Sequence, residues 1–85
     1  MMKLQVISLK GLEFDGKISS LNLKTTAGEI TVLDNHRPLI TRLAKGQAVV
    51  IKENGEKMSF EIGLGFLEVS ERNQATILAS QSKLF

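Results

Sequence analysis

Few side chains in this sequence could do chemistry, and they are not spaced as a catalytic site requires. The chain has one histidine, His36, and no cysteine. A thiol nucleophile, a thiolate metal site and a disulfide are therefore excluded, and a lone histidine cannot complete a metal site. Ser19 and Ser20 have no neighbouring base motif, which a nucleophilic serine needs. We therefore predict a non-enzyme with no catalytic, metal or cofactor site.

Two closely spaced glycines, Gly63 and Gly65, invite comparison with a nucleotide-binding loop. No lysine–serine pair follows them and no helix start is visible, although a phosphate-binding loop needs both. We interpret them instead as small residues in a strand that another backbone or subunit approaches closely.

Charge and aromatic content argue against a nucleic-acid partner. Eleven Lys and Arg are balanced by nine Asp and Glu, and no basic run is present. The chain has no Trp or Tyr, whereas single-stranded nucleic acids bind through aromatic stacking in a basic groove. A small β-barrel that binds nucleic acid, or a stand-alone protein-interaction module, is kept only as the alternative function.

Length and hydropathy pattern predict one all-β domain. The chain has 85 residues, 42% of them hydrophobic and 24% charged, which is globular in composition but too short for two cores. Short alternating stretches end at turn residues, which predicts a sandwich of two antiparallel sheets with about eight to ten short strands. We place the domain at residues 1–79 and a short tail at 80–85.

No membrane segment is expected. The longest aliphatic run covers only residues 48–51, whereas a membrane helix needs roughly 20 apolar residues. We therefore predict no direct membrane insertion.

Turn dipeptides mark where strands should end. Asp15-Gly16 predicts one hairpin, and Asn54-Gly55 predicts another that suits a type I′ turn. Ala27-Gly28 marks a further turn. Residues 34–38 are predicted to be an exposed loop, because Pro38 donates no backbone hydrogen bond and favours extended geometry before it.

Side-chain parity predicts which residues face inward. Ile18 and Leu21 fall on opposite parities, and one extra residue near Ser19-Ser20, a β-bulge, would reconcile them. After the second hairpin the alternation is clearest, with Met58, Phe60, Ile62 and Leu64 on one side. We expect Phe60, Ile62 and Phe66 in the core, whereas adjacent aliphatic pairs such as Ile77-Leu78 predict some outward-facing apolar side chains.

The segment after Pro38 allows two interpretations. Pro38 could occupy the first position of a helix that runs through Leu39, Ile40 and Leu43. The β-branched residues Ile40 and Thr41 and the nearby Gly46 favour a strand from Leu39 to Leu43 instead.

Residues 25–39, TTAGEITVLDNHRPL, resemble the signature of the epsilon subunit of rotary, proton-translocating ATP synthases. That signature consists of a threonine-rich segment, a Gly-Glu pair, an aliphatic strand and a short loop with His and Pro. Residues 63–69, GLGFLEV, resemble a second family segment, and the resemblance extends over residues 3–79. The chain departs from the family pattern at Thr31, Asp34, Asn35 and Leu64, where Gly, Pro or a small residue is usual.

The resemblance implies a non-catalytic central-stalk subunit that links the gamma shaft to the c-ring and couples proton flow to ATP synthesis. Its partners would be gamma and the c-ring, at the cytoplasmic face of the membrane, where it would be a peripheral subunit. The resemblance implies that Glu29, His36, Arg37 and Arg42 contact the c-ring; which face meets gamma is unknown. From the residues alone, His36 is equally a solvated loop histidine, Glu29 an edge-strand carboxylate and Arg42 a surface charge.

Family members commonly carry a carboxy-terminal two-helix hairpin that can brake the rotor and in some cases binds ATP. Only residues 80–85 follow Ala79, too few for two helices of ~11 residues each. We therefore expect neither braking nor ATP binding from this sequence, whether it is a natural short form or an isolated domain.

Overall fold

The computed structural model describes residues 1–84. Its nine strands, with no helix in the described part, are β1 (Met2–Ser8), β2 (Gly11–Thr25), β3 (Gly28–Leu33), β4 (Leu39–Leu43), β5 (Gly46–Lys52), β6 (Lys57–Ile62), β7 (Gly65–Val69), β8 (Gln74–Ala79) and β9 (Ser82–Leu84). The predicted all-β class is confirmed. Accordingly, the described residues include no helix that is long and apolar enough to cross a membrane.

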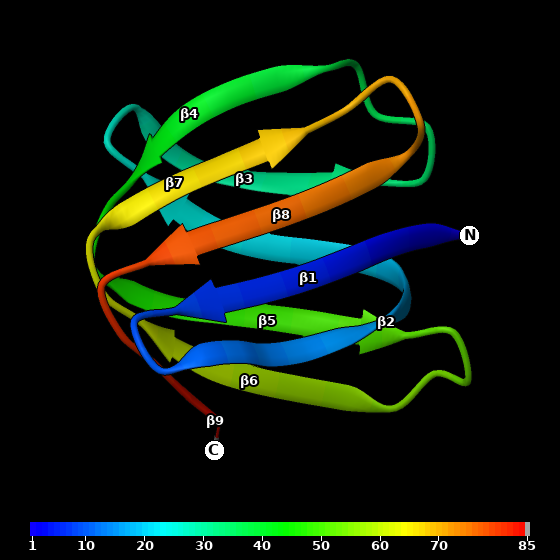
Figure 1. Ribbon diagram of the computed structural model, residues 1–85. Helices are drawn as coiled ribbons and strands as arrows, with labels where there is room; N and C mark the ends of the chain where they lie inside the picture. Colours follow the sequence, from blue (N-terminus) through cyan, green and yellow to red (C-terminus); the bar gives the residue numbers. More distant parts are fainter. Residues whose placement is uncertain (85) are drawn as a thin grey trace.

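The strands form two layers that face each other (Figure 1). One layer has the order β4-β7-β8-β1, and the other has β3-β2-β5-β6-β9. The 15-residue β2 joins the layers, because its first half pairs with β1 and its second half pairs with β3 and β5. The predicted sandwich is confirmed, and every pairing is antiparallel, as predicted, except that of β1 with β8, which makes the first layer mixed.

The core lies between the two layers. Successive side chains of a strand point to opposite faces, and the inward ones are at most 8% exposed: Met2, Leu4, Val6, Ile18, Leu21, Leu23, Val32, Leu43, Ala48, Val50, Phe60, Ile62, Leu67, Val69, Ala75, Ile77 and Ala79. The Phe14 ring meets Phe60 edge-on, with centroids 5.7 Å apart. The predicted inward positions of Phe60 and Ile62 are confirmed.

Phe66 was predicted in the core, and this prediction is wrong. Its side chain is 50% exposed, while Leu67 and Val69 of the same strand are 0% and 2% exposed. Because β7 alternates strictly, the inward Leu67 turns Phe66 outward. Leu64 also departs from its predicted side, since it lies in the turn after β6 and is 66% exposed.

The predicted hairpin at Asp15-Gly16 is also wrong. Both residues lie inside β2, opposite Gln5 and Leu4 of β1, and the chain reverses instead at residues 9–10. A Cβ at Gly16 would lie 3.1 Å from Cζ of Phe14. Glycine at this position therefore leaves room for the Phe14 ring rather than making a turn.

The predicted β-bulge in β2 is confirmed. Ile18 pairs with Lys52 and Ser20 pairs with Ile51, so Ser19 is the extra residue. The Ser19 hydroxyl donates a hydrogen bond to the Ile51 carbonyl oxygen at 3.1 Å. Because the bulge changes parity, Ile18 and Leu21 are both fully buried.

The predicted hairpin at Asn54-Gly55 is confirmed, but the turn type is not. Residues 53–56 connect β5 to β6, and Gly55 has a φ of +89° whereas Asn54 does not adopt a positive φ. A type I′ turn needs positive φ at both central residues. Instead, the Asn54 side chain accepts a hydrogen bond from the Glu56 backbone N–H at 2.9 Å.

The segment after Pro38 is a strand, as favoured from the sequence. Residues 39–43 form β4 and pair with β7 along their whole length. At the other end of the chain, β9 pairs with β6. The described part of the predicted tail therefore extends the second layer, and the sequence analysis did not anticipate that strand.

Candidate interaction surfaces

The predicted contact residues lie at the two opposite ends of β3. Glu29 is the second residue of this strand, whereas His36 and Arg37 follow its last residue, Leu33. The length of strand between Glu29 and Leu33 is roughly 13 Å, at ~3.3 Å per residue. The structure therefore does not bring Glu29 and His36 together at one point.

Glu29 and Arg42 lie at the same end of the sandwich. Glu29 pairs with Lys24 across the β2–β3 hairpin, and the Lys24 carbonyl accepts a hydrogen bond from the Ala44 N–H at 3.0 Å. The Thr26 N–H donates to the Arg42 carbonyl at 3.0 Å. These bonds attach the β2–β3 turn to the end of β4, and the side chains of Glu29 and Arg42 are both exposed there.

The turn that presents Glu29 is fixed by Thr25 and Gly28. The buried Thr25 hydroxyl donates to the Gly28 carbonyl at 2.7 Å and accepts from the Ala27 N–H at 3.1 Å. Gly28 has a φ of +126°, a conformation that L side chains rarely adopt. The threonine and the glycine thus set the direction in which β3 leaves the turn.

His36 lies in the loop of residues 34–38, which joins β3 to β4. Its backbone N–H donates to the Leu33 carbonyl at 3.1 Å. Its ring Nδ1 donates to the Arg37 carbonyl at 2.7 Å, because a carbonyl oxygen can only accept. The ring is partly exposed and lies beside the exposed Arg37.

Asn73, in the turn between β7 and β8, holds this loop. Its side-chain oxygen accepts from the Asn35 N–H at 2.7 Å, and its side-chain nitrogen donates to Oδ1 of Asp34 at 2.5 Å. Sequence analysis missed this pair of contacts. The partners are 38 and 39 residues apart, so no local pattern signals them.

An apolar row crosses the outer face of the first layer. Phe66 pairs with Leu78, Leu78 with Ile7, and Ile7 with Leu12, so these four side chains, the outer apolar row, lie side by side on adjacent strands. Phe66 and Leu78 are each 50% exposed and Leu12 is 58% exposed. The predicted outward-facing aliphatic of the Ile77-Leu78 pair is therefore confirmed.

Two turn residues extend this apolar surface. Leu9 and Leu64 line one shallow depression together with Ile7 and Leu78, and Arg42 is the cross-strand partner of Phe66 at the far end of the row. Large exposed apolar patches on small domains usually mark interaction sites.

Gly65 is needed for the spacing of the strands beneath this surface. A Cβ at Gly65 would lie 1.9 Å from the Leu78 carbonyl oxygen, and one at Gly63 would lie 2.6 Å from Oγ of Ser80. Gly65 therefore permits the close backbone approach that the sequence indicated, whereas Gly63 leaves room for the side chains of Ser80 and Gln81, and neither glycine belongs to a phosphate-binding loop.

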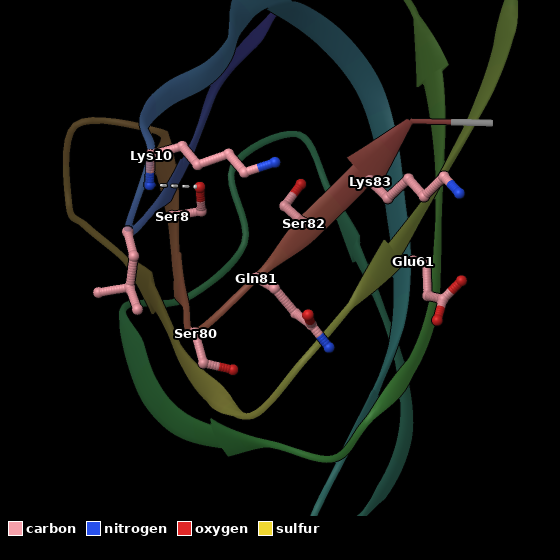
Figure 2. A pocket seen from close by; sticks show the side chains of 8 residues that line it. Ser8, Lys10, Glu61, Ser80, Gln81, Ser82 and Lys83 are labelled. Carbon is pink, nitrogen blue, oxygen red and sulfur yellow. Dashed lines mark hydrogen bonds between the residues drawn. The ribbon is translucent and has the colours of Figure 1, made fainter.

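A depression of about 600 Å³ lies between the β1–β2 turn and β9 (Figure 2), and its lining residues are Ser8, Leu9, Lys10, Glu61, Ser80, Gln81, Ser82 and Lys83. Two of its polar groups already have partners: the Ser8 hydroxyl donates to Glu13 at 2.8 Å and accepts from the Lys10 N–H at 3.2 Å. Within residues 1–84 no group of three or more metal-ligating side chains occurs. The depression therefore gives no basis for a catalytic assignment.

Comparison with known proteins connects this chain to one family. Residues 1–83 match the family model described as "ATP synthase, Delta/Epsilon chain, beta-sandwich domain". The ATP synthase epsilon chain of Corynebacterium aurimucosum is 37% identical over 79 residues, which are 92% of this chain and 64% of the relative. The ATP synthase epsilon chain of Sulfurovum sp. strain NBC37-1 is 30% identical over 78 residues, which are 92% of this chain and 61% of the relative.

Solved structures share the fold. A chain in the Euglena gracilis mitochondrial ATP synthase structure, described as OSCP/F1/c-ring, superposes with a TM-score of 0.88 at 22% identity, over 98% of this chain and 52% of that chain. A chain in the Tetrahymena thermophila mitochondrial ATP synthase structure, described as central stalk/c-ring, gives 0.76 at 18% identity, over 95% and 64%. The present chain thus spans less than two thirds of the length of each of these relatives.

Proposed function

This chain belongs to the ATP synthase delta/epsilon β-sandwich family, and we propose that it serves as the non-catalytic epsilon subunit of a rotary ATP synthase. In this role it links the gamma shaft to the c-ring, so that proton-driven rotation reaches the catalytic subunits. The observation that carries the proposal is the family match over residues 1–83. Such a role requires complementary surfaces rather than a constellation of reacting groups.

The outer apolar row is the surface that we assign to gamma. Fully burying a Leu or Phe side chain stabilises a complex by roughly 1.5–3 kcal/mol, and Phe66, Leu78 and Leu12 are only half covered within the domain. Arg42 and Glu68, both exposed on the same layer, would supply the polar rim of such an interface. An apolar contact suits this position, because the subunit must stay attached while the rotor turns.

The c-ring contact is assigned to the end of the sandwich that carries Glu29 and Arg42. His36 and Arg37 lie at the other end of β3, so the four residues form two separate groups on the surface. We assign Glu29 and Arg42 to the polar loops of the c-ring, and His36 and Arg37 to a second, separate polar contact within the central stalk. Exposed charges at both sites make these contacts sensitive to salt.

The proposal places the protein at the cytoplasmic face of the membrane as a peripheral subunit. It also holds that the sandwich itself binds no ATP, because its closely spaced glycines, Gly63 and Gly65, lie against Ser80 and Leu78 and form no phosphate-binding loop. Calorimetric titration with ATP and magnesium should therefore give only the heat of dilution. A micromolar affinity would show that the sandwich itself holds a nucleotide site.

Binding to gamma tests the proposed role. Purified chain should bind the gamma subunit of its own ATP synthase in a calorimetric titration, with a negative heat-capacity change, because apolar surface is buried. A titration without saturable binding would contradict the assignment.

A further inference from the structure

We propose that Asn73 is a positioning residue, which holds the His36 loop in the conformation that meets the central stalk. This inference rests on the proposed function, because it assigns to Asn73 an effect on a contact that His36 and Arg37 make. Asn73 itself would not touch the partner.

The first observation is backbone geometry. Asn35 and Asn73, with φ of 61° and 58°, are the only non-glycine residues of positive φ in the described chain. Asparagine tolerates this left-handed region better than other L residues. These two unusual positions meet in one contact, since the Asn35 N–H donates to the Asn73 side-chain oxygen at 2.7 Å.

The second observation is the chemistry of the Asn73 amide. A carboxylate can only accept hydrogen bonds, so Asp34 can pair only with a donor, which the Asn73 NH₂ group supplies. The amide oxygen supplies the acceptor for Asn35. Asparagine thus meets two opposite requirements with one planar group, and aspartate in its place would set a carboxylate against Asp34.

The third observation is the anchoring of Asn73 itself. Its carbonyl accepts from the Lys3 N–H of β1 at 3.1 Å, and the Ser70 N–H donates to the Gln74 carbonyl at 2.8 Å across the same turn. The turn is thereby held by the sheet. The Asn73 side chain then connects the loop of residues 34–38 to this turn.

Few other polar contacts restrain this loop. Apart from the Met1 backbone nitrogen, 3.7 Å from Oδ1 of Asp34, the hydrogen bonds from its described residues to distant parts of the chain are the two to Asn73. Removal of the Asn73 amide should therefore release Asn35 and the neighbouring His36, while the core stays intact.

An exchange of donor and acceptor gives a sharp test in the isolated domain. In Asn73→Asp the introduced carboxylate loses the charge-assisted bond to Asp34 and is repelled by it, which draws its oxygen away from the Asn35 N–H. Amide hydrogen exchange at Asn35 measured by NMR should therefore accelerate roughly ten- to a hundredfold, and the His36 ring resonances should shift. In the double variant Asp34→Asn/Asn73→Asp, the amide introduced at position 34 donates to the carboxylate introduced at position 73, which still accepts from Asn35. Protection and the His36 resonances should therefore return toward wild type.

Two further variants separate the effect of the Asn73 side chain from the effect of its backbone conformation. Asn73→Gly keeps the positive φ and removes the amide, so it should lose Asn35 protection as Asn73→Asp does. Asn54→Ala, at a turn asparagine whose side chain bonds only within its own turn, should leave the His36 resonances unchanged. Unaltered Asn35 exchange in Asn73→Asp, or a double variant no better than the single one, would overturn the proposal.

A binding arm distinguishes failure of this inference from failure of the proposed function. ATP synthase depleted of its own epsilon subunit should take up Asn73→Asp as weakly as His36→Ala, and the combined variant should be no weaker. If His36→Ala weakens attachment and Asn73→Asp does not, the positioning role is wrong. If the NMR results are as expected and neither variant alters attachment, the proposed stalk contact at His36 fails, and with it the functional part of this inference.

Discussion

Phe66 of β7 lies directly opposite Leu78 of β8, and both side chains project half-exposed from the outer face of the sandwich. Such cross-strand pairs normally stabilise a sheet by packing against each other. Here they form one end of the outer apolar row, whose side chains Phe66, Leu78 and Leu12 the domain leaves about half exposed, which makes the row the most informative surface for substitution.

A charge in the outer apolar row should weaken the gamma contact without unfolding the domain. Leu78→Glu should weaken binding to gamma at least roughly tenfold, because its cross-strand neighbours Phe66 and Ile7 are apolar and a buried unpaired charge is costly. Leu33→Glu is the matched control, since Leu33 is similarly exposed, at 56%, but lies on β3 of the other layer. Equal losses for Leu78→Glu and Leu33→Glu would show that the row has no special role.

The two phenylalanines should differ sharply in their effect on stability. Phe60→Ala should lower the free energy of unfolding by about 3–5 kcal/mol, because Phe60 is 1% exposed. Phe66→Ala should lower it by less than about 1 kcal/mol, since half of that side chain is already in water. Urea denaturation of both variants measures the difference, and similar losses would contradict the assigned orientation of β7.

The two ends of β3 should act independently. Glu29→Ala and His36→Ala should each leave the melting temperature nearly unchanged, because surface substitutions stay within about 0.5 kcal/mol. Their effects on attachment to the enzyme should add in the double variant, since sites that far apart rarely couple. Glu53→Ala, an exposed carboxylate in the β5–β6 turn, serves as the control.

Two outcomes would change this assignment. If both single variants unfold the domain, the residues are structural rather than contact residues. If both leave coupling intact in the complex, the roles implied by the family resemblance at these positions are wrong.

Gly28 should resist substitution for a purely backbone reason. A Cβ at Gly28 meets no atom within 4 Å, but the φ of +126° is unfavourable for any L side chain, so Gly28→Ala should cost about 1–3 kcal/mol. Gly46→Ala is the control, because its Cβ would meet only the flexible Lys24 side chain, at 3.3 Å, with no positive φ. Equal unfolding free energies for the two variants would contradict this explanation.

Much of this fold could be predicted from the sequence, because side-chain alternation and turn residues determine where strands bend and end. The parity change between Ile18 and Leu21 located the bulge, and Pro38 and Gly55 located a loop and a turn. The orientation of Phe66 was wrongly predicted, although the local alternation indicates it: Phe66 shares its face of β7 with the charged Glu68, while Leu67 and Val69 lie on the other face. The Asp15-Gly16 signal misled because the Phe14 ring, not a turn, requires that glycine.

The candidate site was predicted less completely than the fold. Glu29, His36, Arg37 and Arg42 are all at the surface, but their division between two ends depends on β3 running between them. Asn73 and the outer apolar row depend on strands far apart in sequence. Cross-strand partners such as Ile7 and Leu78 are set by tertiary pairing, which no local motif reports.

The central claim is that this chain couples rotation to proton movement. The most direct measurement is ATP-driven proton pumping, followed with a pH-sensitive dye, in inverted membrane vesicles whose ATP synthase has been depleted of its epsilon subunit. Adding the wild-type chain should restore pumping, Leu33→Glu should restore it equally, and Leu78→Glu should not. Failure of the wild-type chain to restore pumping, although it binds the depleted enzyme, would contradict the claim.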